Sequence, residues 1–285
     1  MRMPSGRDTM VDEARVARHY GKSGIADRLL AALREVNGAD APVTPDALAP
    51  LDHFHGRGVV ATEELVAALK PQPHEAVLDI GSGIGGPARW IAAKCGCRVT
   101  GVDLTPEFCA AARALIEATG LAGRVTILDG SALALPVPDA AFDCAYSQNV
   151  VMNIEDKLGM YREAFRALKP GGRLALSNLC AGAKGDVRYP VPWAMTAETS
   201  FLVPVDRMRA DLEAAGFELV SFRDTTAETL PTVTRNRERL ERDGLPRLGV
   251  HLLMGETARE RQLNSARNME EGRAATVEAL VRKPG

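Results

Sequence analysis

The chain has 285 residues, of which 46% are hydrophobic and 25% are charged, and its formal net charge is −2. This balance gives no reason to expect nucleic acid or an anionic membrane as the main partner, and no apolar run approaches the roughly 20 residues that span a bilayer. Since the polar N-terminus lacks an apolar signal core and the five cysteines have no metal-like spacing, a cytoplasmic protein with reduced thiols is expected.

Residues 1–73 precede the first expected strand and are predicted to form a helical extension that folds over a ligand cleft as a lid. Within it, residues 12–19 and 24–36 are predicted as helices, the second because its apolar side chains recur at helical spacing. Residues 37–50 are rich in Ala, Asp and Pro and predict a loop. Thr62 is the expected N-cap of the next helix.

From residue 74 to residue 285 strands and helices alternate, which predicts a single α/β domain with a parallel sheet covered on both faces. The expected strands are 76–80, 98–103, 125–129, 142–148 and 172–179, and the helices between them are 87–94, 106–119 and 155–168. Asn153 is predicted to cap the last of these helices. The Lys-Pro-Gly-Gly run at 169–172 is expected to end it and turn into the fifth strand.

The C-terminal part is predicted to complete the sheet with strands 217–223 and 275–281, the first of them preceded by a helix at 206–215. Between these strands lies a helical insertion, residues 224–273. Its residues 235–242 mix both signs of charge, which is typical of a solvated or interface face. A substrate wall, a lid and a subunit interface all remain open as its role.

Residues 77–86 predict a nucleotide cradle, because an apolar strand ends there in a glycine-rich turn that precedes a helix. Glycine lets a backbone turn tightly and approach a ligand closely, and a helix start offers unpaired N–H groups. Gly81, Gly83 and Gly86 satisfy the dinucleotide fingerprint. A nicotinamide-dependent oxidoreductase is therefore one interpretation.

Two carboxylates lie beside the glycine turn, and one of them, Asp79, points to a ligand other than a dinucleotide. Asp103 ends the second strand about 20 residues after the glycine turn, where a carboxylate can accept both hydroxyls of a ribose. Asp79 lies at the turn itself, where its charge opposes a pyrophosphate but suits the ammonium group of an amino acid. The sequence therefore favours an adenosyl amino acid over a dinucleotide.

Further motifs follow in a fixed order: Asp129-Gly130-Ser131-Ala132, Ala134-Leu135-Pro136 with Phe142-Asp143, and Leu168-Lys169-Pro170-Gly171-Gly172. Together with the glycine turn, they make the chain from about residue 74 onward resemble the class I S-adenosylmethionine-dependent methyltransferases. The resemblance implies a Rossmann-like α/β fold. It has a seven-stranded, mostly parallel sheet whose last strand is antiparallel, an N-terminal helical extension and a helical insertion before the last strand.

A narrower resemblance is to bacterial small-molecule methyltransferases like those that methylate glycine, sarcosine and dimethylglycine. The matching pieces are residues 52–56, 81–89, 147–149 and 272–273. The same features occur in relatives that act on quinones, sterols, phosphobases and natural products.

The resemblance implies a set of cofactor-binding residues. Asp79 and the backbone of Gly81, Ser82 and Gly83 would hold the methionine end of S-adenosylmethionine. Asp103 would bind the ribose. The remaining cofactor candidates are Leu104, Asp129, Gly130, Ser131 and Ala132 around the adenine, and Ser147 near the sulfonium.

Catalytic and acceptor-binding candidates come from the same resemblance and from position. Tyr20, His55 and Gln148 are the candidates near the transferring methyl. Candidates for the methyl acceptor's pocket are Asn149, Met152, Tyr189, Trp193 and His251. For each of these residues an ordinary packing, capping or surface role is the alternative, as for an aromatic ring with its polar tip in water.

The expected reaction is direct displacement, in which the acceptor's lone pair attacks the sulfonium methyl and S-adenosylhomocysteine is released. The protein mainly aligns the reactants and excludes water. The acceptor is expected to be a small molecule with an amine nitrogen, and the alternative, a carbon or oxygen acceptor, needs a base such as His55 or Tyr20. No metal is expected. An RNA methyltransferase and a non-catalytic adenosyl-ligand-binding protein are the other interpretations, and a homodimer is compatible with the sequence.

Overall fold

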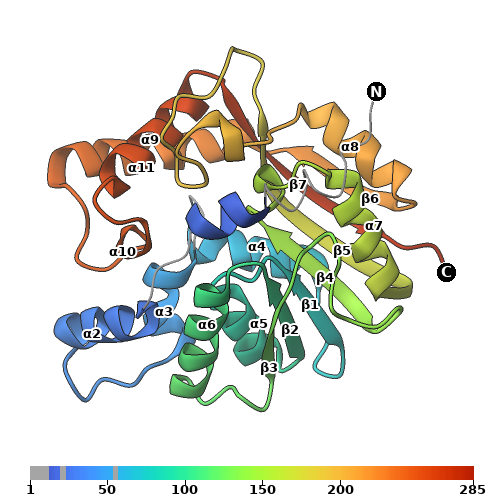
Figure 1. Ribbon diagram of the computed structural model, residues 1–285, viewed down its shortest axis with the longest axis horizontal. Helices are drawn as coiled ribbons and strands as arrows, with labels where there is room; N and C mark the ends of the chain where they lie inside the picture. Colours follow the sequence, from blue (N-terminus) through green and yellow to red (C-terminus); the bar gives the residue numbers. More distant parts are fainter. Residues whose placement is uncertain (1–12, 20–23, 54–56) are drawn as a thin grey trace.

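The computed structural model describes residues 13–19, 24–53 and 57–285 (Figure 1). Seven strands form one sheet in the order β3-β2-β1-β4-β5-β7-β6. Their bounds are β1 Ala76–Ile80, β2 Arg98–Asp103, β3 Val125–Asp129, β4 Phe142–Gln148, β5 Leu168–Ala181, β6 Glu218–Asp224 and β7 Ala274–Arg282. The pairs among β1 to β5 are parallel, whereas β7 runs antiparallel to both of its neighbours. The predicted fold class is confirmed.

Helices cover both faces of this sheet. The α-helices are α2 Ile25–Asn37, α3 Pro45–Asp52, α4 Val59–Leu69, α5 Gly86–Cys95, α6 Pro106–Ala118, α7 Lys157–Ala167, α8 Val205–Ala214, α9 Thr226–Asp243, α10 His251–Met254 and α11 Ala258–Glu270, and residues 13–19 are also helical. Two short 3₁₀ turns are η1 Val151–Asn153 and η2 Ala197–Thr199. Helices α4, α5 and α6 pack on one face, and α7 and α8 on the other.

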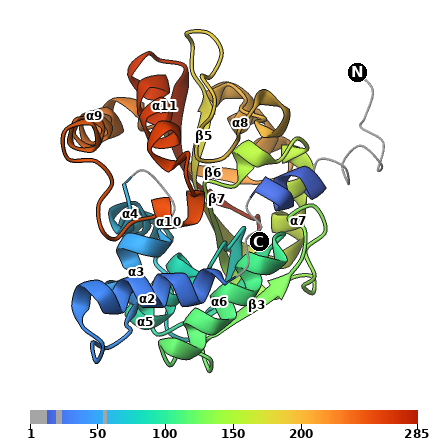
Figure 2. The same cartoon turned by 60° about the vertical axis from the view of Figure 1, so that its left-hand side comes forward.

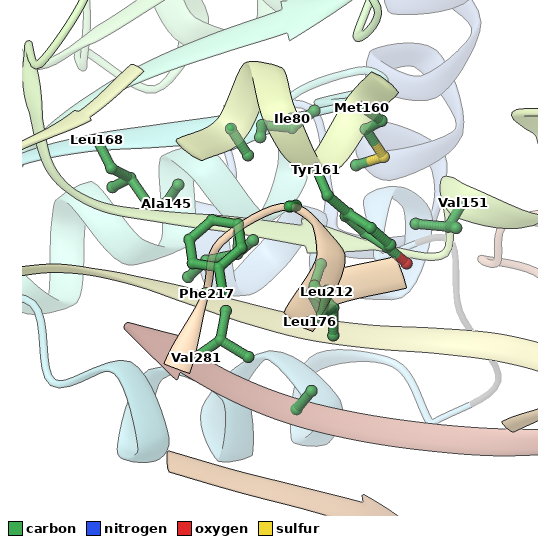
Figure 3. Packing of buried hydrophobic residues seen from close by; sticks show 14 of the residues in the cluster. Ile80, Ala145, Val151, Met160, Tyr161, Leu168, Leu176, Leu212, Phe217 and Val281 are labelled. Carbon is green, nitrogen blue, oxygen red and sulfur yellow. The ribbon is translucent and has the colours of Figure 1, made fainter. Parts of the chain in front are cut away.

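Alternation along the strands explains the two layers, because successive side chains of a strand point to opposite faces. On β5, Leu174 and Leu176 contact the cluster under α7 and α8, whereas Ala175 belongs to the cluster under α4 and α5. Figure 3 shows Tyr161 of α7 and Leu212 of α8 packed in the first cluster. Each buried leucine there stabilises the fold by about 1.5–3 kcal/mol.

A third apolar cluster lies outside the sheet. It joins α2 and α3 to α6 and α10 through residues that include Leu29, Leu51, Leu115 and Leu253. In the insertion, α9 and α11 lie side by side (Figures 1 and 2) and share a small cluster of their own. The N-terminal segment and the insertion therefore meet through α2 and α10.

The predicted loop at residues 37–50 is wrong in its second half, where α3 begins at Pro45. Thr44 caps this helix by accepting a hydrogen bond from the Ala47 N–H at 3.1 Å. Proline at the first helical position is pre-set for helix geometry. The Thr-Pro pair was thus the stronger signal, and the composition of the segment was misleading.

Two capping predictions are also wrong. Thr62 lies inside α4 rather than at its start, with its side chain fully buried. Helix α7 is capped by Asp156, which accepts from the Gly159 N–H at 2.9 Å, and Asn153 instead donates to the Trp193 and Thr199 carbonyls. The Lys-Pro-Gly-Gly run follows the end of α7 as predicted, but it already belongs to β5. Gly171 has φ 74° there, and the register of pairing between β5 and β4 shifts at this point.

Candidate functional site

A hollow lies at the carboxyl ends of the central parallel strands, where ligands of open α/β sheets bind. It contains about 1270 Å³ of empty space, part of it open to solvent. Its walls come from the loop after β1, the ends of β2 and β4 and the residues after β3. It is covered by residues from helix 13–19, α3, α6 and α10, which are Glu13, Val16, Asp52, Phe108 and Leu253.

The glycine loop after β1 is held by its own backbone donors. The N–H groups of Gly81 and Ser82 both donate to the Val102 carbonyl, at 2.8 and 3.0 Å. The Gly83 N–H donates to the Asp103 carboxylate at 2.7 Å. Gly81 has φ 81°, and a Cβ there would lie 2.3 Å from a methyl group of Val150. Glycine is therefore required at position 81 both by conformation and by the close approach of the β4 loop.

Asp103 is fixed at the tip of β2. Its second carboxylate oxygen accepts from the Thr105 N–H at 2.9 Å, and the side chain is buried. Burial raises the pKa of Asp103, while these two backbone donors act in the opposite direction. A carboxylate oxygen accepts more than one hydrogen bond, so both oxygens keep acceptor capacity toward hydroxyl groups in the hollow.

Asp79 is a buried carboxyl group beneath the loop. It is 2% exposed, and the Tyr146 hydroxyl donates to it at 2.7 Å. Burial raises its pKa to about 7, the Tyr146 hydrogen bond lowers it, and the nearby Asp103 charge adds to the increase. An ammonium group placed beside Asp79 would stabilise the ionised carboxylate. The site is therefore suited to a cationic amine next to a ribose.

A buried ion pair joins α3 to the glycine loop. Arg89 donates to Asp52 at 2.5 Å and to the Ile84 carbonyl at 2.7 Å, and both side chains are almost fully buried. The other Asp52 oxygen contacts His53 Nδ1 at 3.0 Å. A Cβ on Gly86 would lie 2.3 Å from the Asp52 carbonyl oxygen. These contacts therefore join two stretches that lie far apart in the sequence, residues 52–53 and residues 86–89.

The residues after β3 meet the N-terminal helix. Gly130, Ser131 and Ala132 line the hollow, and the Ser131 hydroxyl donates to the Glu13 carboxylate and accepts from the Leu133 N–H at 3.0 Å. Asp129 does not line the hollow. It forms a half-exposed ion pair with Arg113 on α6.

At the end of β4, Gln148 and Asn149 line the hollow, while Ser147 points to the opposite face. Asn149 has φ 52°, and its N–H donates to the Ser177 carbonyl at 2.8 Å. Thr62 of α4 donates to the side-chain oxygen of Gln148 at 3.2 Å. The Gln148 side-chain nitrogen is buried and has no hydrogen-bond partner among the described residues.

Three acceptor-pocket candidates, Met152 after β4 and Tyr189 and Trp193 after β5, are packed rather than open. Met152, Tyr189 and Trp193 share an apolar cluster, and the Trp193 indole donates to Ser200 Oγ at 3.0 Å. None of the three is among the residues that line the hollow. His251 at the start of α10 is also outside that lining, and burial lowers its pKa. Tyr20 and His55 lie outside the described residues.

Sequence reasoning missed several residues of the site. Glu13, Thr62 and Phe108 have no local motif that marks them, because each reaches the site only through the packing of its helix. Asp52 and Arg89 both stand in stretches that resemble the small-molecule methyltransferases, but the contact between them is visible only in the structure.

Two features are absent from the described part of the chain. No group of three or more His, Cys, Asp or Glu side chains there is arranged to hold a metal ion. No helix in residues 13–19, 24–53 or 57–285 combines the length and hydropathy needed to cross a membrane.

Comparison with known proteins gives the same class of protein that the sequence motifs resemble, the methyltransferases. The family described as Methyltransferase domain matches residues 78–176. The methyltransferase GfsG of Streptomyces halstedii is 31% identical over 185 residues, 64% of this chain and 66% of that protein. The 27-O-demethylrifamycin SV methyltransferase of Amycolatopsis mediterranei (strain S699) is 30% identical over 190 residues, 63% of this chain and 67% of that protein.

Longer relatives match only in part. Phosphoethanolamine N-methyltransferase 1 of Arabidopsis thaliana is 31% identical over 191 residues, which are 65% of this chain but 37% of that protein. Among solved structures, a geranyl diphosphate methyltransferase in complex with GPP and sinefungin has a TM-score of 0.68 at 18% identity, covering 96% of this chain and 99% of that one. This likeness shows the fold. The chain belongs to the class I S-adenosylmethionine-dependent methyltransferases.

Proposed function

We propose that this chain transfers the methyl group of S-adenosylmethionine to an amine nitrogen of a small molecule. The observation that carries the proposal is the set of carboxylates around the hollow. Asp79 and Asp103 suit the amino acid and ribose of the cofactor, while Glu13 and Glu155 line the hollow in addition to these. Carboxylates beyond those needed for the cofactor favour a cationic acceptor.

The cofactor supplies a methyl group that its sulfonium makes strongly electrophilic. Asp79 would hold the ammonium group of the methionine, and Asp103 would accept hydrogen bonds from the ribose hydroxyls. The residues that cover the hollow would exclude water and align the acceptor nitrogen with the methyl carbon. A cationic amine first gives a proton to solvent or to a nearby carboxylate, because only the neutral nitrogen has a lone pair. That lone pair forms the nitrogen–carbon bond as the carbon–sulfur bond breaks, and S-adenosylhomocysteine and the methylated ammonium product are released.

A second candidate is methylation of an oxygen or carbon atom in a natural product. One observation favours it, namely the contact between Asp52 and His53 Nδ1. Asp52 lines the hollow, and a carboxylate paired with an imidazole can take a proton from a hydroxyl or an activated carbon. The rifamycin methyltransferase among the relatives is named for an O-demethylated compound.

The two candidates are separated by incubating the purified chain with methyl-labelled S-adenosylmethionine and two acceptor panels. One panel holds small primary, secondary and tertiary amines, and the other holds phenols, quinones and sterols. Label in an amine product supports the proposal, and label only in the second panel supports the alternative. His53→Gln is the matched variant, because nitrogen methylation is expected to survive it, whereas oxygen or carbon methylation is expected to fall with it.

A further inference from the structure

The methionine end of the hollow needs a hydrogen-bond donor that the backbone N–H groups of Gly81, Ser82 and Gly83 do not provide. S-adenosylmethionine carries both an ammonium group and a carboxylate at this end. The N–H groups of Gly81, Ser82 and Gly83 are already bonded to Val102 and Asp103, at 2.7 to 3.0 Å. Asp79 is an acceptor that suits the ammonium group and repels the carboxylate. Two buried side-chain donors of the lining have no partner among the described residues, the Ser82 hydroxyl and the Gln148 amide nitrogen. Of these, the Ser82 hydroxyl lies beside Gly101 of β2.

Gln148 is a donor in the right place. It lines the same hollow as Asp79 and lies on the same face of β4 as Tyr146, whose hydroxyl contacts Asp79. Its side-chain nitrogen is buried without a partner among the described residues. A buried amide N–H₂ left unpaired is costly, so a ligand acceptor at this point would be strongly favoured.

Thr62 determines which end of the Gln148 amide faces the hollow. Its hydroxyl donates to the amide oxygen at 3.2 Å, from a fully buried position in α4. Because the oxygen is taken, the nitrogen is the end that remains for a ligand. An amide oriented in this way presents its N–H donors to a carboxylate in the hollow, while its oxygen is directed toward Thr62.

We infer that Gln148 binds the carboxylate of the methionine part of S-adenosylmethionine, and that Thr62 is the positioning residue that orients it. This inference rests on the proposed function, because it takes S-adenosylmethionine as the ligand. The sequence places Gln148 near the transferring methyl group, whereas this inference places it at the amino acid end of the cofactor. It also gives α4, a helix of the N-terminal segment, a part in cofactor binding.

The test uses three thioethers that differ only in the amino acid end. S-adenosylhomocysteine has both charged groups, 5′-S-(3-aminopropyl)-5′-thioadenosine lacks the carboxylate, and 5′-S-(3-carboxypropyl)-5′-thioadenosine lacks the ammonium group. Each is titrated calorimetrically into the full chain and into the Gln148→Leu, Thr62→Val and Thr62→Ser variants. Thr62→Ser keeps the hydroxyl and is the matched control for Thr62→Val.

The wild-type chain is expected to bind S-adenosylhomocysteine about 10- to 100-fold more tightly than the ligand without a carboxylate, the range for a hydrogen bond to a charged group. Gln148→Leu and Thr62→Val should reduce this ratio to within a few-fold of one, while Thr62→Ser keeps it. The preference for the ammonium group should stay unchanged in all variants. A merely structural role of Thr62 would weaken all three ligands alike.

Two results would overturn the inference. One is a carboxylate preference that survives Gln148→Leu. The other is a loss of the ammonium preference in that variant, which would mean that the amide faces the hollow with its oxygen. Failure of the proposed function looks different, since the wild-type chain would then bind none of the three adenosyl ligands and the inference would fall with it.

Discussion

The floor and the cover of the hollow are built in different ways. The floor consists of the glycine loop and the strand ends, and backbone hydrogen bonds such as those from Gly81 and Ser82 to Val102 hold it. The cover consists of residues from helix 13–19, α3, α6 and α10, and side-chain contacts hold it. Arg89 binds Asp52, Ser131 binds Glu13, and Arg261 of α11 donates to the Val191 and Met254 carbonyls and contacts His19. Floor and cover can therefore be perturbed separately.

The Arg89–Asp52 pair should show the largest effect, because it joins floor and cover and is almost fully buried. Arg89→Met leaves an uncompensated carboxylate in the interior, and we expect a loss of about 3–5 kcal/mol in the free energy of unfolding. Urea denaturation followed by circular dichroism measures it. Arg113→Met, which removes the half-exposed pair with Asp129, is the control and should cost about 1 kcal/mol or less. Equal losses in the two variants would contradict the account.

Asp79 should make both stability and binding depend on pH. Its pKa is raised from 3.8 to about 7 by burial in the folded state, so the folded chain holds the proton more tightly than the unfolded chain. This group therefore lowers stability as pH rises from about 4 to about 7, by up to about 4 kcal/mol. We expect Asp79→Asn to melt at a higher temperature than the wild-type chain at pH 8 and at a similar temperature at pH 4.

The same carboxyl must be ionised to pair with an ammonium group. The affinity for S-adenosylhomocysteine should therefore fall about tenfold for each pH unit below 7 in the wild-type chain, and this slope should be absent in Asp79→Asn. Calorimetric titrations at several pH values provide the measurement. A wild-type affinity that is flat between pH 5 and 8 would show that Asp79 does not bind the ammonium group.

Two glycines of the loop offer a matched pair. Gly81→Ala places a Cβ 2.3 Å from Val150 at a positive φ. Gly83 also has a positive φ, but a Cβ added there would have no neighbour within 4 Å. We expect Gly81→Ala to cost about 2–4 kcal/mol and Gly83→Ala about 1–2 kcal/mol in thermal or urea unfolding. If the two variants are equally stable, Val150 does not pack on the loop as described.

The contact between Ser131 and Glu13 should have the smallest effect, since it joins the floor to a single short helix. Ser131→Ala is expected to lower stability by about 0.5–1.5 kcal/mol, the usual net contribution of one hydrogen bond. Glu13→Gln, which keeps a hydrogen-bond acceptor, should cost less. A loss above about 3 kcal/mol in Ser131→Ala would mean that the cover is more strongly coupled to the floor than these contacts indicate.

The floor could be predicted from the sequence because its signals are local. A strand, its glycine turn and the carboxylate after the next strand are each encoded within a few residues, and Asp79 and Asp103 do line the hollow. The cover could not be predicted in the same way. Glu13 and Asp52 act through partners 118 and 37 residues away, and no periodicity or spacing marks such pairs. Trp193 is the opposite case, a residue that the sequence suggested for the acceptor pocket but that packs in an apolar cluster instead.

Calorimetric titration of the purified chain and of Asp103→Ala with S-adenosylmethionine, S-adenosylhomocysteine and NAD tests the central claim most directly. The account predicts that the wild-type chain binds both adenosyl amino acids and not NAD. It also predicts that Asp103→Ala loses most of this affinity, because the ribose hydroxyls lose their acceptor at the tip of β2. Binding of NAD alone, or undiminished binding by Asp103→Ala, would contradict it.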